Sequence, residues 1–305
     1  MMRAMRFGVQ VPQEGVPFDA VLANARRAEE LGYDTVFIPD HLRAVAMPAG
    51  SPAYEGWTTL TGVLMRTPRV HAGLLVGCEA FRPPAWFANA LATLQHMSGG
   101  RVIAGLGAGW CESEYHAYGY QWVSGAERVA RLAEYCEALQ CAWRGEGFAG
   151  SYYSFGGTPD LPKPDPMPPV WIGGQGPKLL EVVARYADVW NGPVLSTDQF
   201  AVRVERLRKL CADAGRPMVE VTYEGPVWID EDADRIEQRL ARNRASDNAV
   251  ARRYAETAVA GTPEQIVARI REYQAAGATQ FIAHFGRTTD LRGMELFART
   301  VMPAF

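Results

Sequence analysis

Residues able to transfer a proton stand where two apolar segments of the chain end. Asp40 and His41 follow the β-branched and aromatic segment 35–39, and His284 lies in the last apolar segment, 280–285. An imidazole titrates near neutral pH, so His41 is a candidate general acid or base that Asp40 can orient or charge. Asp40 and His41 are explained about equally well as ordinary polar residues at the point where a strand leads into a loop. His284 fits a structural histidine at the rim of the fold at least as well as a ligand contact.

Two glycine-rich turns also follow apolar segments and can bring backbone close to a ligand. The segment 101–104 ends in GLGAGW, where Gly107 leaves room for such an approach. In the turn 172–178, IGGQGPK, glycines between a strand and a helix expose backbone N–H groups at a helix amino terminus, which favours phosphate binding. An ordinary tight turn is the simpler alternative. Three cations near these segments can add positive charge, namely Arg82, Arg101 and Lys178.

Two further groups near the strand ends have both a chemical and a structural interpretation. Glu112 and Glu114 lie in a polar loop after GLGAGW, and paired carboxylates can act as acid and base, whereas hydrogen-bonded rim residues are the commoner case. Cys78 ends the segment 70–78, but nothing in the sequence predicts a depressed thiol pKa, so packing is favoured over nucleophilic catalysis. We therefore expect His41 to carry the acid–base chemistry.

Parallel strands bring residues of this kind together, because the strands of a parallel barrel share one mouth at their carboxyl ends. Eight apolar segments predict strands, and a helical pattern follows each of them. The strands are expected at 6–11, 35–39, 70–78, 101–104, 170–173, 188–190, 220–229 and 280–285. The helices are expected at 18–31, 58–66, 83–97, 125–144, 179–186, 198–214, 232–258, 263–276 and 294–301.

This order of elements predicts a single α/β domain over residues 1–305, a (β/α)8 barrel of the TIM type. Such a barrel needs about 250 residues, which leaves room for insertions at 44–56 and 145–169. An open doubly wound sheet is the alternative, but its phosphate-binding fingerprint is missing after the first strand, where the chain reads VQVPQEG. GLGAGW also lacks the third glycine of a dinucleotide-binding motif.

Composition restricts the partners. The net charge is −3 and the basic residues are scattered among acids, so we expect a small-molecule substrate rather than nucleic acid or a membrane surface. The sequence shows neither a signal peptide nor a long apolar span. The five cysteines lack metal-ligand spacing, so reduced thiols in the cytoplasm and no metal are expected; they are Cys78, Cys111, Cys136, Cys141 and Cys211.

Several motifs, taken together and in order, resemble the bacterial luciferase-like monooxygenase superfamily. They are FIPDHL (37–42), VGCEAFRPP (76–84), ATLQHMSGGRVIAGLGAGWCESEYHAYG (92–119), PPVWIGGQGPKLLEVVARYADVWN (168–191) and GTPEQIVARI (261–270). Three of these motifs, SGGR, GAGW and E-Y-x-x-Y-G, are most similar to the branch that uses the deazaflavin coenzyme F420. Relatives that use FMN share much of the same scaffold.

The resemblance implies a TIM-like barrel with the deazaflavin at its mouth. It implies that the cofactor's phosphate binds the turn of Gly174, Gln175 and Gly176, and that a non-proline cis peptide joins Leu75 and Val76 behind the ring. It also implies that the ring or its ribityl chain touches Asp40, Cys78 and Ser113, and that His41 is the acid–base histidine. Trp110 departs from the family's sugar-phosphate and alcohol dehydrogenases, which carry a glutamate there, so their substrates do not transfer directly.

The resulting hypothesis is a cytoplasmic, F420-dependent oxidoreductase that transfers a hydride between deazaflavin C5 and a small organic substrate. His41 assists proton transfer, and the segment 145–169 acts as a partial lid. A homodimer is expected from the resemblance. One alternative is an FMN-dependent monooxygenase supplied by a separate reductase. The other is a protein that binds the cofactor without catalysis.

Overall fold

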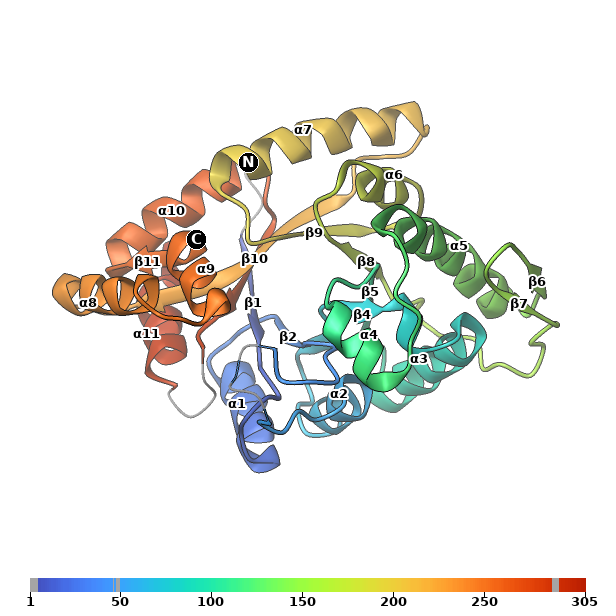
Figure 1. Ribbon diagram of the computed structural model, residues 1–305, viewed down its shortest axis with the longest axis horizontal. Coiled ribbons are helices and arrows are strands. Elements are labelled where there is room, and N and C mark those ends of the chain that lie inside the picture. Colours follow the sequence, from blue (N-terminus) through green and yellow to red (C-terminus); the bar gives the residue numbers. More distant parts are fainter. Residues whose placement is uncertain (1–4, 46, 48–49, 287–290) are drawn as a thin grey trace.

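Eight parallel strands close into a barrel, which confirms the fold expected from the sequence. The computed structural model describes residues 5–45, 47, 50–286 and 291–305. Each barrel strand pairs with the next one around the ring, and the last pairs with the first (Figure 1). In this order the strands are β1 (Arg6–Gln10), β2 (Thr35–Ile38), β3 (His71–Leu74), β5 (Val102–Gly107), β8 (Val170–Gly173), β9 (Val189–Pro193), β10 (Glu220–Ile229) and β12 (Gln280–His284).

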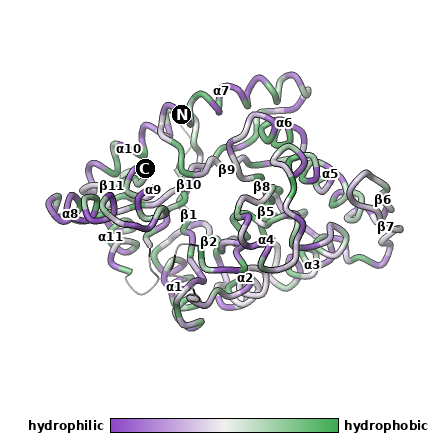
Figure 2. Tube along the Cα trace, viewed as in Figure 1, coloured by the Kyte–Doolittle hydropathy of each residue, from purple (hydrophilic) through white to green (hydrophobic). Residues whose placement is uncertain are grey.

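Helices between the strands cover the outside of the barrel. Figure 2 shows hydrophobic and hydrophilic residues alternating along these helices, as expected when one face packs on the strands and the other meets water. None of the helices within the described ranges is both long and apolar enough to cross a membrane. The covering helices are α1 (Phe18–Glu30), α2 (Gly56–Leu64), α3 (Pro84–Ser98), α5 (Gly125–Arg144), α6 (Pro177–Tyr186), α7 (Thr197–Asp213), α10 (Pro263–Ala275) and α11 (Arg292–Thr300).

Two segments fold differently from the sequence prediction. The single helix expected at 232–258 is wrong, because it divides into α8 (Ala233–Arg244) and α9 (Ala249–Thr257). Asn248 starts the second helix by accepting the backbone N–H of Ala251 at 3.1 Å, as amino-terminal capping residues do. A short strand, β11 (Val259–Gly261), then pairs with the end of β10. The polar loop after GLGAGW contains a helix, α4 (Glu112–Tyr118).

The predicted strand 70–78 is interrupted. After β3, the peptide between Leu75 and Val76 is cis, as the family resemblance implies, and a second short strand, β4 (Gly77–Cys78), pairs with β5. A 3₁₀ turn, η1 (Glu79–Phe81), leads on to α3. The backbones are very close here, since a Cβ on Gly105 would lie 1.9 Å from the Leu74 carbonyl oxygen. A glycine on β5 therefore permits the irregular end of β3.

Side chains alternate along the strands between the outer core and the barrel interior. The interior is filled by one apolar cluster, made of Phe37, Leu75, Ile103, Trp171, Val189 and Ile282. Nearer the carboxyl ends, the inward positions differ around the ring. They are glycines on β5 and β8, but asparagine, glutamate and histidine on β9, β10 and β12. The mouth therefore has a bare half and a polar half.

The segment 145–169 lies outside the barrel. It contains the hairpin of β6 (Phe148–Ala149) and β7 (Ser154–Phe155), at the edge of the molecule in Figure 1. Glu134 of α5 accepts the N–H groups of residues 151–153, and Gln95 of α3 donates to the Pro166 carbonyl at 2.6 Å. The expected partial lid is therefore wrong, because this segment packs on the outer helices. Residues 46, 48 and 49 of the other predicted insertion, 44–56, lie outside the described residues.

Candidate active site

The barrel mouth contains a hydrogen-bonded pair formed by His41 and Glu114. His41 follows the end of β2, and Glu114 comes from α4 after β5. His41 Nδ1 lies 2.9 Å from Glu114 Oε2, and the side chains are only 16% and 2% exposed. The second oxygen, Oε1, accepts the backbone N–H groups of Leu42 at 2.7 Å and Arg43 at 3.1 Å. Glu114 thus fixes both the imidazole and the backbone that carries it.

Each member of this pair stabilises the charged form of the other. Burial lowers the pKa of His41, but the hydrogen bond to Glu114 and the charges of Glu114, Glu14 and Asp40 outweigh burial, so the net pKa is raised. Burial raises the pKa of Glu114, but His41 and the two backbone N–H groups outweigh it, so the net pKa is lowered. An ionised Glu114 accepts hydrogen bonds only, so Nδ1 carries a proton. The other nitrogen of His41, Nε2, is then the one that gains or loses a proton.

Asp40 is held in a buried ion pair. Arg82 donates to both of its oxygens, at 2.7 and 2.8 Å, and the Cys78 N–H donates to Oδ2 at 2.8 Å. Arg82 also contacts Glu55, which caps the start of α2. Burial lowers the pKa of Arg82, yet the two carboxylates outweigh it and the net pKa is raised. This arrangement joins β2 to β4. Arg82 pairs with carboxylates, so it does not add positive charge at a phosphate site as the sequence suggests.

Cys78 and Ser113 occupy different environments. The Cys78 Sγ is buried and lies 3.0 Å from the Tyr115 hydroxyl, and burial raises the pKa of the thiol to about 12. A thiol with so high a pKa is a poor nucleophile, in line with the packing role favoured by the sequence. Ser113 lies in the first turn of α4 and is exposed, with its hydroxyl 3.4 Å from the Cys111 sulfur. Cofactor contact by Asp40, Cys78 and Ser113 stays a prediction.

The bare half of the mouth has the shape that a flat ring needs. A Cβ added to Gly107 would lie 2.5 Å from Val76 Cγ2, and one added to Gly173 would lie 2.9 Å from Val76 Cγ1. At these positions β5 and β8 thus present only backbone atoms around the small side chain of Val76, next to the buried Leu75. Any larger residue at Gly107 or Gly173 would displace Val76 and fill the surface, so these residues fit a planar tricyclic cofactor.

The turn after β8 fits an anion. Gly174 has φ +134°, which only glycine adopts readily, and its carbonyl accepts the Trp190 indole N–H at 2.7 Å. A Cβ on Gly176 would meet nothing within 4 Å, so the start of α6 faces open space. The first N–H groups of a helix lack partners within that helix, and its dipole attracts negative charge. Arg203 of α7 adds a cation, donating to the Gln175 carbonyl at 3.2 Å.

Sequence reasoning missed part of this arrangement. Arg203 was not singled out, since nothing in the helical pattern of α7 shows that it reaches the turn after β8. Arg101 does not reach the mouth, because it donates to the carbonyls of Thr67 and Val70 near the amino-terminal ends of the strands. Trp110 stands at the mouth, 62% exposed, with its ring centroid 5.4 Å from that of His41 in an edge-to-face contact.

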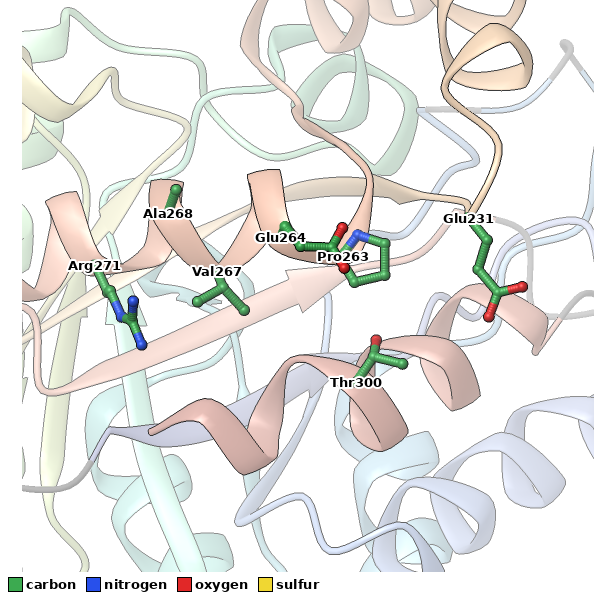
Figure 3. Close-up of a pocket in the computed structure, with 7 residues that line it drawn as sticks. All are labelled: Glu231, Pro263, Glu264, Val267, Ala268, Arg271 and Thr300. Carbon is green, nitrogen blue, oxygen red and sulfur yellow. The ribbon is translucent and has the colours of Figure 1, made fainter.

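Two cavities lie away from these residues. One of about 760 Å³ opens at the amino-terminal end of the barrel, where Arg6 pairs with Glu220. The other, of about 460 Å³, is a groove between α10 and α11 (Figure 3). Its charged residues, Glu231, Glu264 and Arg271, are exposed. Neither cavity includes the His41–Glu114 pair, so the mouth at the carboxyl ends remains the candidate active site.

Comparison with known proteins agrees with this geometry. Residues 4–280 match the family model described as luciferase-like monooxygenase. The chain is 29% identical over 313 residues to the F420-dependent glucose-6-phosphate dehydrogenase of Amycolatopsis mediterranei (strain U-32), covering 92% of each chain. It is 29% identical over 331 residues to the enzyme of the same name from Nakamurella multipartita, covering 98% of this chain and 96% of the relative.

A solved structure shares the whole fold. An F420-dependent secondary alcohol dehydrogenase, in complex with an F420-acetone adduct, superposes with a TM-score of 0.86 at 22% identity and covers 99% of both chains. At this identity the likeness establishes the barrel with its surrounding helices and leaves the chemistry to be argued from the residues of the mouth.

Proposed function

We infer that this chain, which belongs to the luciferase-like monooxygenase family, is an F420-dependent oxidoreductase acting on a small organic substrate. Its similarity to F420-dependent glucose-6-phosphate dehydrogenases extends over more than nine-tenths of the chain. The single observation that carries the proposal is the buried His41–Glu114 pair at the mouth of the barrel. A proton carrier beside a surface suited to a flat ring is what hydride exchange with an alcohol or a carbonyl compound requires.

Two parts of the chain are suited to hold the cofactor. The backbone of Gly107 and Gly173, with Val76 between them, forms the surface for the ring. The turn of Gly174, Gln175 and Gly176, together with Arg203, is suited to the phosphate. When bound, F420 supplies the hydride chemistry at its C5 carbon. The protein's contribution is to orient the reactants and to exclude water from the buried side of the site.

His41 moves the proton that accompanies the hydride. With Nδ1–H donated to Glu114, the Nε2 atom takes the hydroxyl proton when an alcohol is oxidised and returns it when a carbonyl is reduced. Glu114 stabilises the protonated imidazole and fixes its tautomer, as a carboxylate does for a catalytic histidine in other enzymes. The Trp110 ring packs edge-to-face against the imidazole at the mouth.

A paired titration tests this proposal. Apo protein is titrated with F420 and separately with FMN, and tryptophan fluorescence is recorded. We expect micromolar binding of F420 and much weaker binding of FMN, followed by F420-linked turnover without oxygen. Preference for FMN, with turnover only in the presence of a flavin reductase and oxygen, would replace the proposal with an FMN-dependent monooxygenase. Binding of F420 without turnover of any substrate would indicate a cofactor carrier.

We also propose that the protein works as a homodimer in the cytoplasm. The dimer rests on the family resemblance, and the cytoplasm rests on five cysteines that are all free. Light scattering during size-exclusion chromatography gives the mass of the particle directly, and a mass near twice that of the chain is expected. A monomeric mass at micromolar concentration would refute the dimer.

A further inference from the structure

A second polar group lies inside the same mouth, on strands β9, β10 and β12. Asn191, Glu224 and His284 occupy the inward positions above Val189 and Ile282 of the barrel's apolar interior. Asn191 donates its amide to Glu224 and accepts the Thr222 hydroxyl at 2.9 Å. His284 Nε2 lies 3.0 Å from Glu224 Oε1, off the direction of a hydrogen bond. The Asn191 amide thus holds one oxygen of the carboxylate, and the His284 imidazole lies beside the other.

This group is costly for the fold, because a buried carboxylate is held by neutral or weakly basic partners among the described residues. The Glu224 and His284 side chains are only 11% and 12% exposed. Within the described part of the chain the side-chain partners of Glu224 are the Asn191 amide and the His284 imidazole, with no lysine or arginine, and burying a carboxylate without a permanent cation is unfavourable. Apolar side chains at these positions would extend the interior cluster at no such cost. The placement therefore points to a ligand that donates hydrogen bonds or carries positive charge.

The group and the His41–Glu114 pair share one electrostatic environment. Tyr254 of α9 is partly buried, and this burial together with the charges of Glu224 and Glu14 raises its pKa. The charge of Glu14 also raises the pKa of His41. Glu14 therefore lies within electrostatic range of both groups. The inward Glu224 carboxylate repels a phosphate or carboxylate and attracts an ammonium or hydroxyl group.

We propose that Glu224, His284 and Asn191 bind the substrate and select an uncharged or cationic alcohol, or the matching carbonyl compound, over a phosphate ester or carboxylate. This inference rests on the proposed function, because it concerns the substrate of the same site. It predicts that the chain differs in substrate class from the glucose-6-phosphate dehydrogenases to which it is similar.

The test uses F420-loaded protein and three probes that differ in one group. These are 1,2-propanediol, 1-amino-2-propanol and lactate, with hydroxyacetone, aminoacetone and pyruvate for the reverse direction, and glucose 6-phosphate beside them. We expect turnover or calorimetric binding of the neutral and amine probes at least 10-fold more favourable than that of the anionic ones. Equal or better use of lactate or glucose 6-phosphate overturns the proposal, as does binding of none of the three-carbon probes.

Two variants assign the selectivity to this group. Glu224→Gln removes the charge and keeps the shape, and its KM for the amine probe should rise about 10-fold or more with kcat nearly unchanged. His284→Gln should raise the KM for the neutral probe and serves if Glu224→Gln does not fold. The matched control is Glu220→Gln, at the other end of β10, which should leave both constants unchanged. Unchanged KM in both test variants overturns the assignment.

F420 affinity separates this inference from the proposed function. Both variants should bind F420 as the wild type does, because Glu224 and His284 lie on β10 and β12, whereas the glycines suited to the ring lie on β5 and β8. Failure of the wild-type protein to bind F420 would refute the proposed function itself. Normal F420 binding with selectivity for anionic probes would refute only the substrate class.

Discussion

Glu114 accepts hydrogen bonds from the His41 imidazole through one oxygen and from the next two backbone N–H groups through the other. The two residues are 73 positions apart in the sequence and come from the loop after β2 and from α4 after β5. One carboxylate therefore sets the charge, the tautomer and the position of the imidazole.

The substitution Glu114→Gln should weaken catalysis and shift its pH dependence. A neutral amide no longer stabilises the protonated imidazole, so we expect the limb of the pH–rate profile that reports His41 to move to lower pH. The value of kcat should fall by about 100-fold or more, as for a triad that loses its carboxylate. Glu112→Gln is the control, since Glu112 is exposed on the same helix and, among the described residues, pairs with His116 at 3.3 Å. An unshifted profile in Glu114→Gln would rule out this role.

The same pair should make stability depend on pH. The pKa of His41 is raised by folding, so its contribution is complete below about pH 6.5 and is lost as the pH rises through the folded value. The pKa of Glu114 is lowered, so its contribution is present above about pH 4.5 and is lost as the pH falls through the folded value. Urea unfolding should therefore show the largest difference between wild type and Glu114→Gln from about pH 4.5 to 6.5. A difference that stays constant up to pH 9 would contradict this.

The strand ends and His41 could be predicted from the sequence, because alternation and glycine stops mark where parallel strands finish. The role of Glu114 could not. In the sequence it is one of two acids in a polar loop, and only the folding of α4 turns it toward His41 and leaves Glu112 in solvent. Local pattern fixes which residues occur near a mouth, whereas the direction of each side chain depends on the helix that carries it.

Glu224 and Arg203 show a second limit of prediction from the sequence. The strand prediction 220–229 was correct in its bounds, and alternation along it places Glu224 inward, but an acid inside a barrel conflicts with burial preferences and was passed over. Arg203 contacts Gln175 across 28 positions, through the packing of α7 beside α6. The sequence offers Arg82 only as added positive charge near the glycine-rich turns, and it relates Asp40, the partner of Arg82 in the structure, only to its neighbour His41.

The ion pair of Asp40 and Arg82 should be important for stability. Arg82→Leu leaves the Asp40 carboxylate buried without its cation, so we expect a loss of about 3–5 kcal/mol in the free energy of unfolding. Adding Asp40→Asn to that variant should recover part of the loss. Arg144→Leu, which breaks an exposed pair with Glu146, serves as the comparison and should change stability very little. The measurement is urea denaturation, and equal losses in both arginine variants would argue against a special role for Asp40.

The glycines of the turn after β8 allow a paired test of the phosphate site. Gly174→Ala places a Cβ at φ +134° and 2.9 Å from Leu179, so it should cost about 1–3 kcal/mol of stability and weaken F420 binding. Gly176→Ala meets open space at an extended φ, so it should fold normally. Its affinity for F420 should nevertheless fall, because the methyl group stands where the phosphate approaches. Unchanged F420 affinity in Gly176→Ala would place the phosphate elsewhere.

Trp110 should affect the substrate and leave the fold intact. Its side chain is 62% exposed and contacts the His41 ring edge-to-face, and such aromatic contacts contribute about 0.5–1.5 kcal/mol. Trp110→Ala should therefore raise KM about 2- to 10-fold with little change in melting temperature. Trp110→Phe should keep most of the effect. A large loss of stability in Trp110→Ala would show that the ring supports the loop instead.

The most direct test of the central claim compares wild type with His41→Gln in two measurements on the same preparations. F420 affinity is obtained by fluorescence titration, and kcat by F420-linked turnover without oxygen. We predict an unchanged dissociation constant for F420 and a kcat lower by about 100- to 10,000-fold, because only proton transfer is removed. Turnover by His41→Gln within a few-fold of wild type would contradict the assignment of His41 as the proton carrier.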